Sequence, residues 1–320
     1  MKYSHKLIVL FLLVFVSAFF LMMHHDKTSS VALVDSKPKM PPTTLLAEVS
    51  FVSPPPFDRF GIKNLYPTAT SGRTWVANWD NSISRTILSG KRDPQDAEFI
   101  VRGNGTATID GNGIAHLSGA SPRMYIYDAL KQKKWKNVEV TVYAKRVAES
   151  GVKSSQGFVV GARSEHQDAN DAMPCLGRTY YGRLLYDGRG VFQKEVIHEE
   201  SYSVNKPSAN NKVAWNTASG TLPYDVWVGM KFVVKTNSQG KSVRLKLYRD
   251  LTNGKNGGTW ENIATYDDVG GWAQINSGVD VKSRCGYNAD KILLDPGTSV
   301  FIRNDEVSDV QYKNFSIREI

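Results

Sequence analysis

The chain has 320 residues and a net charge of +9, from 40 lysines and arginines against 31 aspartates and glutamates. The positive charges form no run or arm, which argues against a nucleic-acid-binding protein and is compatible with an acidic polymer ligand or with ordinary solubility. The sequence has no HExxH or G-x-S-x-G motif and no cysteine or histidine cluster with zinc-site spacing, so we expect neither a zinc protease nor a serine hydrolase.

Residues 1–25 have the character of a signal peptide or a signal-anchor helix. Lys2 and Lys6 precede the apolar run Leu7–Met23, whose 17 residues are the lower limit for crossing a bilayer. Small residues at 16–18 and 30–32 offer cleavage sites, so a cleaved signal and an uncleaved anchor both stay open, and we favour the anchor. Either one predicts a body outside the cytoplasm, membrane-anchored or secreted.

Residues 26–56 are predicted to be a linker, because prolines recur at Pro38, Pro41-Pro42 and Pro54–Pro56. Proline-rich segments are extended and hold a domain away from a membrane. The folded domain is therefore placed at residues 57–320, with the core of the sandwich at about 95–320.

Short strand-like segments separated by turn motifs follow one another from about residue 98. Alternation is clearest in Asn137–Val147, where Val138, Val140 and Val142 fall on one side. The body shows no convincing helical pattern, so the sequence predicts an all-β sandwich of the jelly-roll type. The expected strands are 98–102, 113–117, 123–128, 137–147, 157–163, 178–186, 191–198, 226–236, 242–249, 260–267, 299–304 and 311–319.

Two cysteines, Cys175 and Cys285, lie far apart in the sequence. In an exported protein they could form one disulfide that closes a long loop. The alternative is two separate thiols, and both stay open.

Three strand-like segments carry a resemblance to a known superfamily: Asp225–Val234, Val243–Tyr248 and the closing segment Tyr312–Arg318. Over roughly residues 95–320 the chain resembles the concanavalin A-like lectin/glucanase superfamily, which includes legume-type lectins, laminin-G-like modules, β-glucanases and several polysaccharide lyases. The resemblance implies a jelly roll that faces carbohydrate. The Glu-x-Asp-x-Glu signature of its glucanases is missing, and the motifs of its alginate lyases survive only as fragments such as Arg178, Tyr180 and Gly182.

The segment Arg178–His198 reads as two strands joined at Asp187-Gly188, with aromatic and charged residues at most positions. A loop of two or four residues would place Tyr181, Arg183, Lys194 and His198 on one face of this hairpin. The other face would hold Tyr180 with Gln193 and Glu195. A loop of three residues would change the pairing and void this assignment.

The first face has the groups that β-elimination from a uronic-acid polymer requires. Arg183 or Lys194 could neutralise the carboxylate of the uronate, while Tyr181 and His198 could serve as base and acid. These four are the candidate catalytic residues. The candidate substrate-binding residues are Arg163, His166, Arg178, Tyr180, Gln193 and Glu195.

A solvated or ligand-binding face accounts for the same residues without catalysis. The favoured function is therefore an exported, membrane-anchored domain that recognises carbohydrate at the cell surface. A polysaccharide lyase acting on uronate-containing glycans is one alternative, and a structural surface domain without a glycan ligand is another. The only cofactor suggested is calcium, for which Asp305, Glu306 and Asp309 offer oxygen ligands. The expected partners are a glycan and, through the N-terminal segment, a membrane.

Overall fold

The computed structural model describes residues 57–148, 157–170, 172–198, 206–207, 221–272, 279–305 and 309–320. The predicted N-terminal helix and the linker up to residue 56 lie outside these ranges. Within them, no helix has both the length and the apolar character needed to cross a bilayer.

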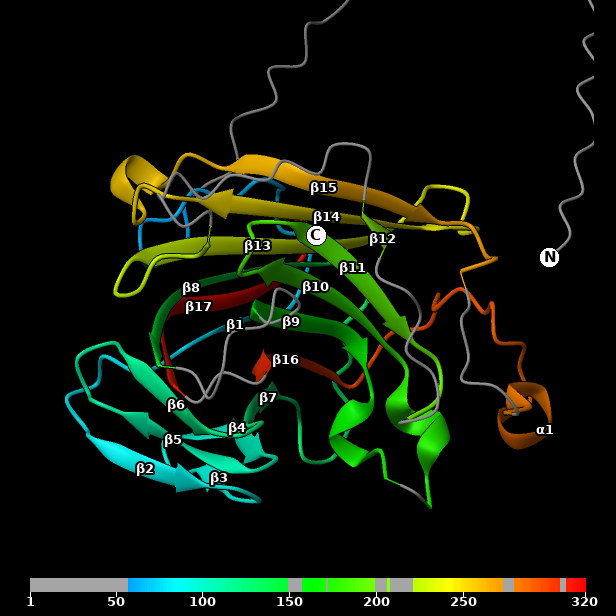
Figure 1. The fold of residues 1–320 in the computed structure, drawn as a ribbon, viewed down its shortest axis with the longest axis horizontal. Helices are drawn as coiled ribbons and strands as arrows, with labels where there is room; N and C mark the ends of the chain where they lie inside the picture. The colour runs from blue at the N-terminus through cyan, green and yellow to red at the C-terminus, as the bar shows by residue number, and fades with distance from the viewer. Residues whose placement is uncertain are drawn as a thin grey trace, which may run out of the picture. The chain divides into compact units, whose positions relative to one another are not determined.

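Two antiparallel sheets pack against each other in the described part of the chain (Figure 1). The nine-stranded sheet has the order β15-β14-β13-β8-β17-β6-β5-β2, with β1 paired to β17. Its strands are β1 (Thr74–Val76), β2 (Arg85–Leu88), β5 (Gly105–Ile109), β6 (Ala115–Gly119), β8 (Val138–Ala148), β13 (Trp227–Thr236), β14 (Val243–Asp250), β15 (Glu261–Asp268) and β17 (Asp309–Glu319).

The eight-stranded sheet has the order β12-β11-β10-β9-β16-β7-β4-β3. Its strands are β3 (Arg92–Asp93), β4 (Asp96–Arg102), β7 (Arg123–Ile126), β9 (Gly157–Ser164), β10 (Thr179–Leu185), β11 (Gly190–Glu195), β12 (Lys206–Pro207) and β16 (Ser299–Asp305). The all-β antiparallel sandwich expected from the sequence is confirmed, and it fits a jelly roll. Every expected strand overlaps an observed one. Strands β1 to β3, before residue 95, are part of the same two sheets.

The core lies between the sheets and is built by alternate residues of the strands. In β14, Val243, Leu245 and Leu247 are buried, while Arg244 between them is exposed. Across the core, the ring of Phe192 in β11 stacks on Phe232 in β13 with 6.1 Å between the ring centroids. This alternation is expected for a strand that buries one face and exposes the other.

Short helical turns lie outside the sheets: η1 (His166–Asp168), η2 (Pro174–Gly177), η3 (Lys255–Gly257) and the α-helix α1 (Val281–Cys285). The expectation of a body without helices is wrong for α1. The side chain of Asp280 caps this helix by accepting the Ser283 N–H at 3.1 Å, and Gly286 ends it with a φ of +74°.

A disulfide joins Cys175 in η2 to Cys285 at the end of α1, with the two Cα atoms 5.6 Å apart. Of the two alternatives left open by the sequence, the structure has the bonded one. The bond ties together two turns that are 110 residues apart in the sequence.

The loop of the β10–β11 hairpin has three residues, Tyr186 to Gly188. The Leu185 N–H donates to the Arg189 carbonyl at 2.9 Å, and Gly188 has a φ of +86°. A three-residue hairpin loop of this kind needs a left-handed residue at its last position, which glycine supplies. The predicted loop lengths of two and four residues are therefore wrong.

The predicted sorting of side chains between the faces of the hairpin is wrong for the same reason. Tyr181 pairs with Gln193, so the pairing is shifted by one residue, and such a shift turns every side chain of one strand to the opposite face. Glu195 and Gln193 share a face with Tyr181. Lys194, expected beside Tyr181, points into the sandwich with Phe192.

Candidate functional site

Four arginines form a row across the outer face of the eight-stranded sheet, the face turned away from the other sheet. Arg102 of β4 stands opposite Arg123 of β7, and Arg123 stands opposite Arg303 of β16. The next strand, β9, contributes Val159, which is in register with both Arg303 and Arg183 of β10. Because neighbouring strands lie about 4.8 Å apart, this arginine row extends over roughly 19 Å.

The arginine row concentrates positive charge at one place. Like charges directly opposite each other on neighbouring strands destabilise a sheet. Within the described residues, neither Arg102 nor Arg123 makes an ion pair, and the Nε of each is buried without a hydrogen-bond partner. The row is therefore a site whose charge favours an anion.

A row of mostly apolar side chains lies beside the arginine row, two residues further along the strands. It contains Ile100, Tyr125, Phe301, Gly161 and Tyr181, in register in that order. A Cβ on Gly161 would lie 2.2 Å from the Phe301 ring, so the ring can cover β9 only because this residue is glycine. These buried side chains form a second, smaller core on the outer face.

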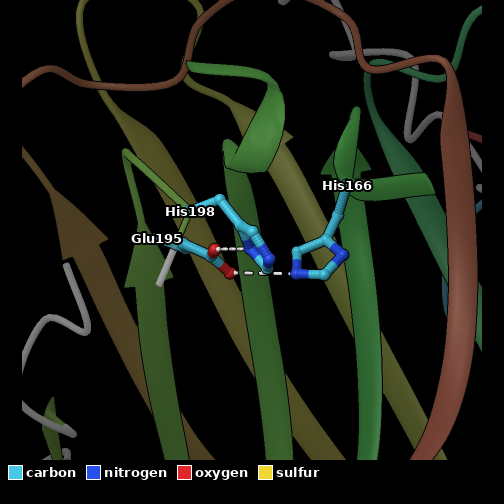
Figure 2. A group of neighbouring side chains, drawn as sticks. All are labelled: His166, Glu195 and His198. Carbon is cyan, nitrogen blue, oxygen red and sulfur yellow. Dashed lines mark hydrogen bonds and ion pairs between the residues drawn. The ribbon is translucent and has the colours of Figure 1, made fainter. Parts of the chain in front are cut away.

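Beyond this row, His166, Glu195 and His198 come together (Figure 2). His166 lies in η1 just after β9, Glu195 ends β11, and His198 follows three residues later. The His198 Nδ1 is 3.0 Å from one carboxylate oxygen of Glu195, and the His166 Nε2 is 3.5 Å from the other. The Glu195 side chain is fully buried and that of His166 is 3% exposed.

Two tyrosines of the apolar row contact this cluster through their hydroxyl groups. The Tyr125 hydroxyl is 2.8 Å from the Nδ1 of His166, and the Tyr181 hydroxyl donates to Glu195. Burial raises the pKa of Tyr125 to about 12 and raises the pKa of Tyr181 well above its usual value, with the Glu195 charge adding to the second shift. Both tyrosines are therefore neutral phenols near neutral pH.

His166 is neutral as well. Burial lowers its pKa to about 2, and the charges of Arg123, His198 and Arg303 act in the same direction. A neutral imidazole carries one N–H, on either of its ring nitrogens. The Tyr125 hydroxyl and the His166 Nδ1 share one hydrogen bond, whose direction depends on which nitrogen carries that hydrogen.

A pocket of about 380 Å³ connects these features, because its lining includes Arg102, Arg123, Tyr125, His166 and His198. Two arginines of the row and both histidines of the cluster thus face one space. A ligand in this pocket would touch fixed cations on one side and imidazole rings on the other.

Among the predicted catalytic residues, the structure brings Tyr181 and His198 to the Glu195 cluster and Arg183 to the arginine row. It does not bring Lys194 there. The Lys194 Nζ is 2.9 Å from a carboxylate oxygen of Asp268 in β15, and the side chains of both residues are fully buried. Tyr180 donates to the same oxygen at 2.5 Å, so this predicted binding residue also faces the interior.

The other predicted binding residues divide between two places. His166, Gln193 and Glu195 belong to the outer face, and Gln193 accepts from Arg183 at 3.3 Å. Arg163 and Arg178 line a second pocket of about 280 Å³.

Within that second pocket, Arg163 and Arg178 are engaged by the protein itself. Arg163 donates to the carbonyls of Lys136 and Leu293, each at 2.7 Å, and Arg178 forms an ion pair with Glu165. Arg163 thus holds neighbouring loops together.

The predicted calcium ligands are only partly described. The side chain of Asp305 and all of Glu306 lie outside the described residues. The Asp309 carboxylate lies against the Nε2 of His116 in β6, so one of the three expected ligands already has a neighbouring polar group.

The prediction from sequence missed Arg102, Arg123, Tyr125 and Arg303. Each occupies an outward position of a predicted strand, which was a usable signal. However, their convergence depends on β16 lying between β7 and β9, and neither periodicity nor turn motifs contain that strand order.

No family model and no curated protein matches this chain. Among solved structures it is similar to lectin II from Ulex europaeus, at 10% identity and a TM-score of 0.37 over 75% of this chain and all of that one. It is similar to an alginate lyase from Chlorella virus, at 11% identity and a TM-score of 0.34 over 70% of this chain and 93% of that one.

It is also similar to the receptor-binding domain of a botulinum neurotoxin of mosaic serotype C/D, at 12% identity and a TM-score of 0.34. That match covers 76% of this chain and spans about half, 48%, of the other chain. The sequence predicted a resemblance to concanavalin A-like proteins. Lectins and an alginate lyase, two kinds of protein in that superfamily, are among the similar structures. Likeness at these values carries no argument about activity.

Proposed function

We propose that the outer face of the eight-stranded sheet binds an acidic polysaccharide. The observation that carries the proposal is the arginine row, in which Arg102, Arg123 and Arg303 stand directly opposite one another. Repulsion within the row would be relieved by a bound polyanion.

A polymer fits this row better than a single small anion. The row extends over roughly 19 Å across the strands. A linear chain lying along it would contact Arg102 and Arg123 directly and would also feel the charges of Arg303 and Arg183, which are buried. The apolar row with Tyr125 and Tyr181 runs parallel to it and gives the site a rigid floor. Because each arginine is attached to a different strand of the same sheet, the spacing of the row does not depend on a bound ligand.

Binding to polyuronates, sulfated polysaccharides and neutral glucans tests the proposal. We expect binding to acidic polymers only, weakening as salt rises. The double variant Arg102→Gln/Arg123→Gln should lose at least about tenfold in affinity, since each change removes a charge-assisted contact. Arg244→Gln is the matched control, because Arg244 is exposed on the other sheet and pairs with Asp267. Equal binding to neutral glucans would refute the proposal.

A second candidate is a lyase that cleaves such polymers by β-elimination. The observation that favours it is a series of side-chain contacts: Tyr125 contacts His166, His166 contacts Glu195, and His198 contacts the same carboxylate. Arginines would neutralise the uronate carboxylate while His198 takes the proton from C5. The electron pair forms the C4–C5 double bond, the C4–oxygen bond breaks, and Tyr125 protonates the departing oxygen.

Ultraviolet absorbance of the unsaturated uronate tests this second candidate. With a lyase, Tyr125→Phe should slow product formation strongly and leave polymer binding nearly unchanged. Tyr127→Phe is the control, as Tyr127 directly follows β7 and is buried with its ring under Arg92. Binding without any rise in absorbance would leave the non-catalytic binding domain.

We also propose that the body works outside the cytoplasm, carried there by residues 1–25. The apolar run in that segment and the disulfide of the body both support an oxidising compartment. Cell fractionation with a protease-protection assay tests it. A body that stays protected by the intact plasma membrane would overturn it.

A further inference from the structure

We infer that His166, Glu195 and His198 form a binding site for one divalent transition metal, with Zn²⁺ the best match. This site goes beyond the proposed polysaccharide binding and does not depend on it. The three side chains come from η1, the end of β11 and the turn after β11, so tertiary structure assembles the site (Figure 2).

The distances between the candidate ligand atoms suit a metal. All three lie within 4.8 Å of one another, with separations of 3.0 and 3.5 Å between the Glu195 oxygens and the two imidazole nitrogens. Four ligands at about 2.0–2.1 Å around tetrahedral zinc stand roughly 3.3 Å apart. Small rotations of the histidine side chains would therefore close the set around an ion.

The Nε2 of His166 is a second observation that points to a ligand. This nitrogen is buried and faces the cluster, yet it makes no hydrogen bond to any described residue. A buried polar atom without a partner is uncommon in proteins and calls for an explanation. Coordination of a metal through this nitrogen would satisfy it.

The groups behind the ligands have the arrangement that metal sites use. The Nδ1 of His166, on the side away from the cluster, bonds the Tyr125 hydroxyl at 2.8 Å. Glu195 accepts from the Tyr181 hydroxyl. Such outer contacts fix the ring and carboxylate orientations of metal ligands.

The chemistry of the donors selects the kind of metal. Two imidazole nitrogens and one carboxylate suit zinc and its neighbours in the first transition row, whereas calcium prefers oxygen ligands alone. This site is therefore distinct from the calcium site predicted at Asp305, Glu306 and Asp309. Three protein ligands leave a fourth position, and the pocket beside Arg123 lies next to it. A water or a ligand carboxylate could occupy that position.

The experiment is metal binding by the full chain after treatment with a chelator. We expect one Zn²⁺ per chain by equilibrium dialysis, and a Co²⁺ form with the visible absorption of a tetrahedral ion. His166→Ala and His198→Ala should each lower the affinity at least about tenfold. His116→Ala is the control, because His116 pairs with Asp309 away from the cluster. His24 and His25 are present in every variant, so their contribution cancels.

A second variant, which should keep the fold, distinguishes loss of a ligand from loss of zinc binding by unfolding. Tyr125→Phe retains the ring and removes the hydroxyl behind His166, and it should weaken Zn²⁺ binding about 10–100-fold with an unchanged circular dichroism spectrum. Wild-type affinity in His166→Ala/His198→Ala, or no binding by the wild type, would overturn the inference.

The metal site and the polysaccharide site can be tested separately. Arg102→Gln/Arg123→Gln should leave the zinc stoichiometry unchanged, because neither arginine is a ligand. A metal would occupy His198, which the lyase candidate uses as its base, so the two are alternative uses of that side chain. Product formation that survives complete removal of the metal would show that the ion takes no part in the reaction, and the dialysis stoichiometry decides whether the ion is bound.

Discussion

The main-chain nitrogen of His198 donates to the carbonyl oxygen of Pro174 at 2.8 Å. Pro174 begins η2, and Cys175 in the same turn is bonded to Cys285. Gly177, at the other end of η2, packs so closely that a Cβ there would lie 2.8 Å from a Glu195 carboxylate oxygen. The disulfide therefore supports the turn that holds His198 and covers Glu195.

Removing the disulfide should destabilise the fold and loosen the pocket. In Cys175→Ser/Cys285→Ser the free energy of unfolding should fall by about 2–5 kcal/mol, because a long loop of the unfolded chain is no longer constrained. Urea denaturation measures the change, and wild-type protein in reductant is the control. Equal midpoints with and without the bond would show that η2 is held by its hydrogen bonds alone.

Lys194 should behave as a structural residue. Burial lowers its pKa, and Asp268 opposes that shift, as expected for a lysine paired inside a core. Lys194→Met leaves Asp268 buried without its cation and should cost about 3–5 kcal/mol of stability. Adding Asp268→Asn should restore part of the loss, since the amide still accepts from Tyr180. Chemical denaturation of the single and double variants decides; a stable but inactive Lys194→Met would instead favour a role at the site.

Asp250 should contribute to stability above acidic pH. Burial alone would raise its pKa, but hydrogen bonds from Thr252, Gly254 and Thr259 outweigh it, so the pKa is lowered from 3.8. A carboxyl whose pKa is lower in the folded state stabilises the fold above its unfolded pKa, and this contribution disappears as pH falls through the folded value.

Asp250→Asn should therefore lower the melting temperature at pH 7. The difference in melting temperature between variant and wild type should become smaller as the pH falls below about 4. Thermal melts from pH 7 to pH 2 measure it. Asp267→Asn is the comparison at an exposed position of β15: the hydrogen bond from Arg244 lowers the pKa of Asp267 too, but solvent screens this pair, so the pH-dependent change should be smaller. A constant difference across that range would show that the effect lies in packing and not in the carboxylate charge.

Gly161→Ala tests the apolar row directly. The new methyl group would collide with the Phe301 ring, and such overpacking typically costs about 1–3 kcal/mol. Since the Phe301 ring lies 4.7 Å from Tyr125 and 5.8 Å from Tyr181 between centroids, we also expect weaker polymer binding. Calorimetry of unfolding and of binding would measure both; wild-type values in both would mean that Phe301 can move freely.

The sequence predicted the strands well because each depends on local alternation and turn residues, as in Asn137–Val147 and β8. It failed at the hairpin loop, where one extra residue, Tyr186, reversed the facing of Lys194 and Glu195. It could not find the arginine row, since facing between Arg123 and Arg303 depends on long-range pairing. Local periodicity contains no information on which distant strands become neighbours.

The arginine row draws on segments that the ribosome makes at very different times, since Arg102 and Arg123 come early and Arg303 near the end of the chain. Arg303 reaches its place only when β16 enters between β7 and β9. Pairings over such separations in sequence form slowly, because a long loop must close first. An unfinished chain therefore lacks the complete row, and polyanion binding should develop only as the last strands join the sheets. Ligand capture would then serve as a reporter of finished folding.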